Sequence, residues 1–124
     1  PWVGQHDPDF TSDGRISVYN NNTGRGRSEV LLMDPATRDV DNNLFGGEAS
    51  FRSEYMGKHQ YLPNGNVLVV VPGEGRILEF TKDGKNVMEF NNLAGSSVKY
   101  NGHVENGLWV PADYFQSVPD CPQD

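Results

Sequence analysis

Three histidines, His6, His59 and His103, are the side chains of this sequence best suited to chemistry near neutral pH. Imidazole changes its charge close to neutrality and can act as a base or as a nucleophile. His6 is followed by Asp7 and Asp9, and a neighbouring carboxylate can fix the tautomer that leaves one ring nitrogen free to attack. A histidine and an aspartate in such a segment can equally tie two loops together. Both roles for His6 stay open at this point.

Four cationic side chains could hold an anion. Arg25 and Arg27 lie in a Gly-rich loop, and Arg52 and Lys58 precede a strand-like segment. A guanidinium binds sulfate or carboxylate through two parallel hydrogen bonds, which makes arginine the better anion ligand. The same residues are also common in solvated loops, so an ordinary surface role is the alternative.

The spacing of the histidines argues against a metal site. They are 53 and 44 residues apart, without a close His, Cys or Glu partner at the spacings of zinc sites. Asp and Asn are frequent, but their order does not match a calcium-binding loop and is more typical of turns. No phosphate-binding Gly-rich loop and no redox Cys pair occurs. We therefore expect no metal and no cofactor.

Net charge and hydrophobicity exclude two classes of partner. The formal net charge is −7, whereas binding to nucleic acid or to an anionic membrane surface needs a positive surface. The longest apolar run, 67–71, has the length of a buried strand and is far below the roughly 20 residues of a membrane span. We expect neither a nucleic-acid partner nor a membrane span.

Two features concern covalent modification. Asn21, Asn22 and Thr23 match the N-glycosylation pattern in a loop that we expect to be exposed. The single cysteine, Cys121, lies in a Pro-flanked tail and has no partner within the chain, so it either pairs with an outside thiol or stays free.

Short strands must position these residues, because 14 Gly and 8 Pro among 124 residues disfavour helices. The sequence also resembles itself. Residues 10–19 match 61–70 at an offset of 51, and 28–37 match 75–84 at an offset of 47. Each first segment has an aromatic residue, a turn at Asp13-Gly14 or Asn64-Gly65, and then an apolar strand.

Two further turn signals extend the pattern. Asp83-Gly84 lies between apolar segments and favours a two-residue type I′ hairpin, in which both central residues have positive φ. Asn106-Gly107 precedes the apolar run 108–110 and begins a third, weaker unit. Five aromatic residues at strand positions are expected in the core: Phe10, Tyr61, Phe80, Phe90 and Trp109.

The size of the units predicts an all-β chain, part of a β-propeller. Four short strands in roughly 40 to 50 residues is the period of propeller blades. We expect a single propeller segment over 1–124 with units at about 5–50, 51–95 and 96–118 and a tail at 116–124. A jelly roll or an immunoglobulin-like sandwich does not predict strand phrases that recur in order.

About two and a half blades cannot close a ring, since closure takes at least about four blades. We therefore expect a fragment, with the remaining blades upstream or on another chain. The start of each innermost strand tends to face the central channel, where propellers bind ligands. This makes His59 a candidate substrate-binding residue, and His103 fits the pattern less well. Arg52, as a cation that could hold a sulfate, is the other candidate.

Four phrases, read in order, resemble the arylsulfotransferase (ASST) family: QHDPDF at 5–10, VYNN at 18–21, MDPAT at 33–37 and HQYLPNGNVL at 59–68. The resemblance implies the C-terminal blades of a six-bladed propeller that is exported in bacteria, hence a periplasmic or secreted protein. It also implies an enzyme that moves a sulfuryl group from a phenolic sulfate ester to another phenol without a nucleotide donor.

The resemblance assigns a role to His6. In that family a histidine in a Gln-His motif at the start of a late blade is the nucleophile, and Gln5-His6 looks like that motif. The family's other catalytic histidines and an arginine lie in earlier blades and are not carried over. The alternative is a non-catalytic propeller segment that binds a ligand or protein or serves as a scaffold. The enzyme predicts that His6 and His59 approach one channel, whereas the alternative predicts that His6 is buried in a local hydrogen-bond network, away from any pocket.

Overall fold

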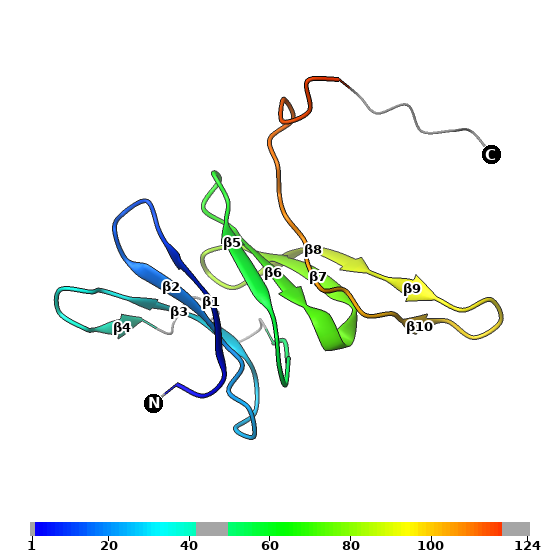
Figure 1. Ribbon diagram of the computed structural model, residues 1–124, viewed down its shortest axis with the longest axis horizontal. Coiled ribbons are helices and arrows are strands. Elements are labelled where there is room, and N and C mark those ends of the chain that lie inside the picture. Colours follow the sequence, from blue (N-terminus) through cyan, green and yellow to red (C-terminus); the bar gives the residue numbers. More distant parts are fainter. Residues whose placement is uncertain (1, 42–49, 118–124) are drawn as a thin grey trace.

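Strands dominate the computed structural model, which describes residues 2–41 and 50–117 (Figure 1). The first antiparallel sheet has the order β1-β2-β3-β4, and the second has the order β5-β6-β7-β8. The strands of the first sheet are β1 (Gln5–Phe10), β2 (Ile16–Asn20), β3 (Glu29–Met33) and β4 (Val40–Asp41). Those of the second are β5 (Lys58–Tyr61), β6 (Val67–Val71), β7 (Arg76–Phe80) and β8 (Asn86–Asn91).

A two-stranded hairpin of β9 (Leu93–Ala94) and β10 (Tyr100–Asn101) forms the third sheet and projects away from the second one (Figure 1). The described residues contain one 3-10 turn, η2 (Pro72–Glu74), and no α-helix. The all-β prediction is confirmed, as three small antiparallel sheets rather than as a closed ring. No helix in the described part of the chain is long and apolar enough to cross a membrane.

The two larger sheets have the same strand order and nearly the same spacing. β6 begins 51 residues after β2, at 67 against 16, and β7 begins 47 residues after β3, at 76 against 29. These differences equal the two offsets at which the sequence resembles itself. The strands therefore lie where the recurring phrases place them.

Three hairpins turn through a three-residue loop. The closing bonds run from the backbone N–H of Thr11, Leu62 and Thr81 to the carbonyls of Arg15, Asn66 and Lys85, each 2.9 Å long. Only the glycine of each loop has positive φ, at 83° for Gly14, 84° for Gly65 and 83° for Gly84. The type I′ prediction at Asp83-Gly84 is therefore wrong. The loop is a type I turn followed by a left-handed glycine, which needs one residue of positive φ instead of two.

The apolar core is shared by the two larger sheets. Phe51 is 2% exposed and lies between Tyr19 of the first sheet and Phe80 of the second, with ring centroids 5.6 Å and 6.0 Å away. Val67, Val69 and Val71 alternate along β6 and face the same cluster. Phe51 precedes β5 and fills the space between the sheets.

Three of the five predicted core aromatics lie at the surface. Phe80 is 1% exposed and Tyr61 packs against the core, but Phe10 is 75%, Phe90 50% and Trp109 39% exposed. Phe10 and Phe90 lie on β1 and β8, the edge strands of their sheets. Strand position alone predicted burial, whereas an edge strand has a neighbour on one side only. The core prediction is wrong for Phe10, Phe90 and Trp109.

No strand forms over 106–110, where the third unit was expected. Gln60 of β5 instead pairs with Trp109 through both halves of its amide: Trp109 N–H donates to Oε1 at 2.9 Å and Nε2 donates to the Trp109 carbonyl at 3.2 Å. A Cβ on Gly107 would lie 2.7 Å from Cδ1 of Ile77, so the segment presses closely on the second sheet. A side-chain amide here takes the place of a strand partner.

Candidate functional site

His6 lies half-buried on β1, and its ring is held at one nitrogen. His6 pairs with Tyr19 of β2 and Gln5 pairs with Asn20. Nδ1 of His6 lies 2.6 Å from Oδ1 of Asn21 and 3.1 Å from the carbonyl oxygen of Gly4. The fold thus brings the Gln-His phrase and the end of the Tyr-Asn-Asn phrase into direct contact.

The Asn21 amide has a defined orientation. Its Nδ2 donates to the backbone carbonyls of Ser53 at 2.9 Å and Met56 at 2.6 Å, and the residue is 1% exposed. Since Nδ2 faces two acceptors, Oδ1 is the atom that faces His6. Asn21 therefore offers the ring an acceptor and not a donor.

Both groups beside Nδ1 of His6 are acceptors, so this nitrogen carries the proton. In a neutral imidazole the other nitrogen then has a lone pair. All hydrogen bonds of the ring among the described residues are at Nδ1. Nε2 of the neutral ring is thereby left with its lone pair, which is the state that a nucleophile needs.

The two aspartates beside His6 have other partners, so neither sets its tautomer. An Oδ2 oxygen of Asp7 accepts a hydrogen bond from the backbone N–H of His59 at 2.7 Å, and Asp9 accepts one from the N–H of Phe10 at 2.8 Å. Asp7 has a φ of 50°, and the register of β1 against β2 shifts between His6 and Asp9. This bulge directs the Asp7 carboxylate toward the second sheet.

Sequence reasoning missed Asn21 because it is 15 residues from His6 and its carbonyl partners are 32 and 35 residues from it. The Tyr-Asn-Asn phrase was the available signal. The expected exposure is wrong for the acceptor residue of the glycosylation pattern, because Asn21 is buried although the loop from Thr23 onward is exposed. A glycan on Asn21 would replace one of its two Nδ2 hydrogens and so remove one of its two hydrogen bonds. Cys121 lies outside the described residues.

His59 lies on β5 and connects the two larger sheets through its contacts with Ser17 of β2 and Asp7 of β1. Its side chain is 1% exposed, its Nε2 lies 2.8 Å from Oγ of buried Ser17, and its Nδ1 lies 3.3 Å from Oδ2 of Asp7 without hydrogen-bond alignment. Burial lowers the pKa of His59 below its ordinary value of 6.5, and the carboxylates of Asp7 and Asp9 oppose this effect. The neutral ring is favoured, and a substrate could reach it only if the contact between the sheets opened.

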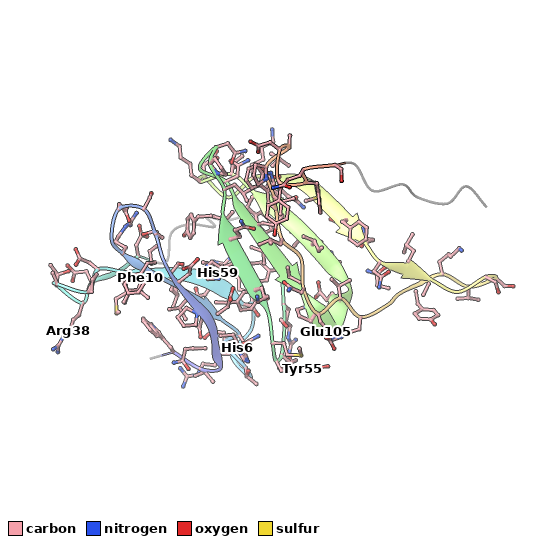
Figure 2. All side chains as sticks on the ribbon, turned by 45° about the horizontal axis from the view of Figure 1, so that its top comes forward. His6, Phe10, Arg38, Tyr55, His59 and Glu105 are labelled. Atoms are coloured by element: carbon pink, nitrogen blue, oxygen red, sulfur yellow. The ribbon has the colours of Figure 1, made fainter. Side chains whose placement is uncertain are left out.

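Arg52 lies on the surface near this network. Its side chain is 60% exposed and contacts the Glu54 carboxylate. The residue borders a hollow of about 250 Å³, lined by Arg52, Ser53, Glu54, Tyr55, Gly73 and Glu74. Ser53 is next in the chain, and its carbonyl accepts a hydrogen bond from Asn21, the residue that contacts His6. In Figure 2 the labelled His6 and Tyr55 lie toward the same side of the molecule.

The remaining predicted residues lie apart from this network. Arg25 and Arg27 are in the exposed loop after β2, and Lys58 is exposed at the start of β5. His103 is exposed, and its carbonyl accepts a hydrogen bond from Asn92 at 3.0 Å. Within residues 2–41 and 50–117, no group of three His, Cys, Asp or Glu side chains could hold a metal ion.

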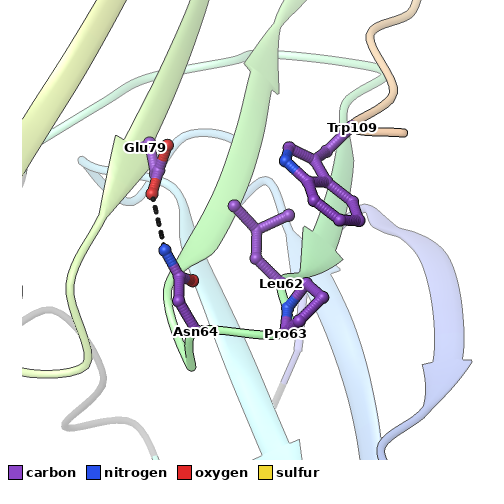
Figure 3. Close-up of a pocket in the computed structure, with 5 residues that line it drawn as sticks. All are labelled: Leu62, Pro63, Asn64, Glu79 and Trp109. Carbon is purple, nitrogen blue, oxygen red and sulfur yellow. Dashed lines mark hydrogen bonds between the residues drawn. The ribbon is translucent and has the colours of Figure 1, made fainter. Parts of the chain in front are cut away.

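Two other hollows flank Trp109 at the turn ends of the hairpins. One of about 170 Å³ is lined by Leu62, Pro63, Asn64, Glu79 and Trp109, with Asn64 bonded to Glu79 at 3.5 Å (Figure 3). The other, of about 390 Å³, extends over Phe10, Thr11, Ser12 and Tyr61. Neither hollow is lined by His6, His59 or Arg52.

A family model described as arylsulfotransferase (ASST) matches residues 1–93. The matched range contains His6, Asn21, Arg52 and His59. No curated protein matches the chain.

Proposed function

The chain belongs to the arylsulfotransferase (ASST) family, and on this premise we propose that it transfers a sulfuryl group from a phenolic sulfate ester to a phenol, with His6 as nucleophile. The observation that carries this proposal is the position of Nδ1 of His6 between two acceptors, Asn21 Oδ1 at 2.6 Å and the Gly4 carbonyl at 3.1 Å. The lone pair of the neutral ring is then on Nε2.

The reaction has two displacement steps at sulfur. In the first, the Nε2 lone pair forms an N–S bond, the S–O bond to the aryl group breaks, and a phenolate leaves with the electron pair of that bond. The ring keeps its Nδ1 proton and carries a positive charge. In the second, an acceptor phenol that has given its proton to the departed phenolate attacks sulfur, the N–S bond breaks, and neutral His6 returns. Sulfuryl transfer resembles phosphoryl transfer in spreading negative charge over three oxygens.

Arg52 and His59 have different proposed roles in this scheme. The sulfate oxygens need a cation or hydrogen-bond donors, and Arg52 is the exposed cation nearest in sequence to the loop that holds Asn21. For His59 we propose a role in binding or proton transfer that operates through Asp7, the residue next to the nucleophile. The hydrogen bond of 2.7 Å from the His59 backbone N–H to Asp7 Oδ2 supports this link between the two residues.

We further propose that the two larger sheets are successive blades of a six-bladed propeller in a periplasmic or secreted protein. Three observations support the blades: identical strand order, strand spacings of 51 and 47 residues, and a shared core. Unit boundaries near residues 50 and 95 stay predictions. The location rests on the family resemblance alone.

Mass spectrometry after incubation with an aryl sulfate tests the function. The full-length protein should gain the mass of one sulfuryl group and release the phenol, and His6→Ala should abolish both. His103→Ala is the matched control and should behave as the parent. If neither an adduct nor phenol is detected, the enzyme proposal fails, and a ligand-binding, protein-binding or scaffold role takes its place.

A further inference from the structure

We propose that Asn21 is a positioning residue for His6, which selects the proton position on the ring and links it to the loop that enters the second sheet. The expected effect of Asn21 on the rate of sulfuryl transfer rests on the proposed function. Its structural part, the tautomer of His6, stands independently. The geometry that points to it is the set of three contacts of the buried amide, one to His6 and two to Ser53 and Met56.

The amide cannot rotate to the opposite assignment without losing all three contacts. A rotated Asn21 would place Oδ1 against the carbonyls of Ser53 and Met56, where no donor exists. It would also place Nδ2 against Nδ1 of His6, which could then accept only by giving up its proton and its bond to the Gly4 carbonyl. Two backbone carbonyls of the second sheet's entry loop therefore determine the tautomer of a residue on β1.

A neutral amide suits both steps of the transfer. Its oxygen stabilises the positive charge that develops on the ring when the N–S bond forms. A carboxylate at this place would favour the doubly protonated ring even before reaction, and that form has no lone pair at Nε2. Asn21 thus keeps the ring reactive and still supports the charged intermediate.

The loop around Ser53 has further bonds to the first sheet, and these provide the control. Oγ1 of Thr23 donates to the Glu54 carbonyl at 2.8 Å, and Ser28 and Ser53 exchange bonds of 2.9 Å and 3.1 Å. Thr23 is exposed and makes no hydrogen bond to His6, whose ring bonds only Gly4 and Asn21 among the described residues. Thr23→Ala therefore weakens the same loop attachment and leaves the acceptor at His6 in place.

The test is nitrogen-15 NMR of the histidine rings in the full-length protein, with the His6 signals identified by their loss in His6→Gln. Unmodified protein should show a protonated Nδ1 and an unprotonated Nε2. Asn21→Ala should show a mixture of tautomers, with kcat reduced on the order of 10- to 100-fold and a smaller change in KM. Asn21→Asp should move the acidic limb of the pH–rate profile to higher pH. Thr23→Ala should match the parent in the His6 tautomer, in kcat and KM, and in the pH–rate profile.

A neutral His6 ring protonated at Nε2 in the unmodified protein would overturn the proposal, whether or not any Asn21 variant folds. An unchanged tautomer in folded Asn21→Ala would overturn it as well. The spectra do not depend on turnover, so a protein that shows the Nδ1–H tautomer but forms no sulfuryl adduct removes the proposed function and leaves the role of Asn21 intact.

Discussion

At the scale of single residues, His6 and His59 differ in how their imidazole rings are surrounded. The His6 ring is half-buried with both contacts at Nδ1, whereas both nitrogens of the His59 ring lie against protein groups in a side chain that is 1% exposed. A nucleophile needs an accessible nitrogen, whereas the buried His59 ring is bonded through Nε2 to Ser17 of the first sheet. The proposed roles, catalysis for His6 and support for His59, rest on this difference.

Arg52 provides a prediction about substrate affinity. Arg52→Ala should raise KM for an aryl sulfate by about tenfold with a smaller effect on kcat, because a charged hydrogen bond contributes about 1.5 kcal/mol. Steady-state kinetics of the full-length protein measures both constants. Arg27→Ala, in the exposed loop, should leave KM unchanged. An equal KM in Arg52→Ala and Arg27→Ala would contradict a binding role for Arg52.

His59 provides a prediction about pH. Its folded-state pKa lies below the ordinary 6.5, so the unfolded chain binds this proton more readily than the folded one. Its contribution to stability is complete above about pH 6.5 and is lost as the pH falls from there toward the folded-state pKa. Relative to His59→Gln, the parent should lose up to about 1.4 kcal/mol per pH unit in this window.

Urea unfolding at pH 7.5 and 5.5 measures this difference, and taking it between two variants cancels the shared carboxylates. His103→Gln, which changes an exposed ring, should keep the pH dependence of the parent. If His59→Gln showed the same pH dependence as the parent, the ring would not titrate differently on folding.

At the scale of elements, the hairpin loops depend on one glycine each. Gly65 has a φ of 84° and empty space around its Cβ position, so Gly65→Ala meets no clash and suffers only the backbone penalty. We expect a loss of about 1 to 2 kcal/mol. Gly73 also has open space but no positive φ, so Gly73→Ala should change stability by less than about 0.5 kcal/mol. Thermal unfolding of both variants gives the comparison, and equal melting temperatures would speak against it.

The strands could be predicted from sequence, whereas their side-chain partners could not. An aromatic residue, a turn dipeptide and an apolar run are local signals, and they placed β2 and β6 correctly. The loop type at Asp83-Gly84 was wrong because the same dipeptide fits a two-residue and a three-residue loop. The apolar run 108–110 does not form the expected strand, because the backbone of Trp109 pairs with the side-chain amide of Gln60, 49 residues away. Asn21 was missed for the same reason, because its partners lie 15, 32 and 35 residues away in the chain.

At the scale of the whole molecule, Phe51 joins the sheets into one core. Phe51→Ala should cost about 3 to 5 kcal/mol, the range for a large aromatic lost from a packed interior. Phe10→Ala makes the same change at a residue that is 75% exposed and should cost less than about 1 kcal/mol. Chemical unfolding distinguishes the two. Similar losses of stability in both variants would show that the rings of Tyr19, Phe51 and Phe80 do not form a common core.

β8 affects the protein concentration at which unfolding and activity should be measured. It is the margin of the second sheet, and Val87, Met88 and Phe90 on it are 49%, 36% and 50% exposed. An edge strand of this kind presents unpaired backbone amides and carbonyls, with apolar side chains beside them, to a strand of another copy of the chain. At high concentration the protein should therefore tend to self-associate, whereas dilute samples should show the behaviour of the monomer.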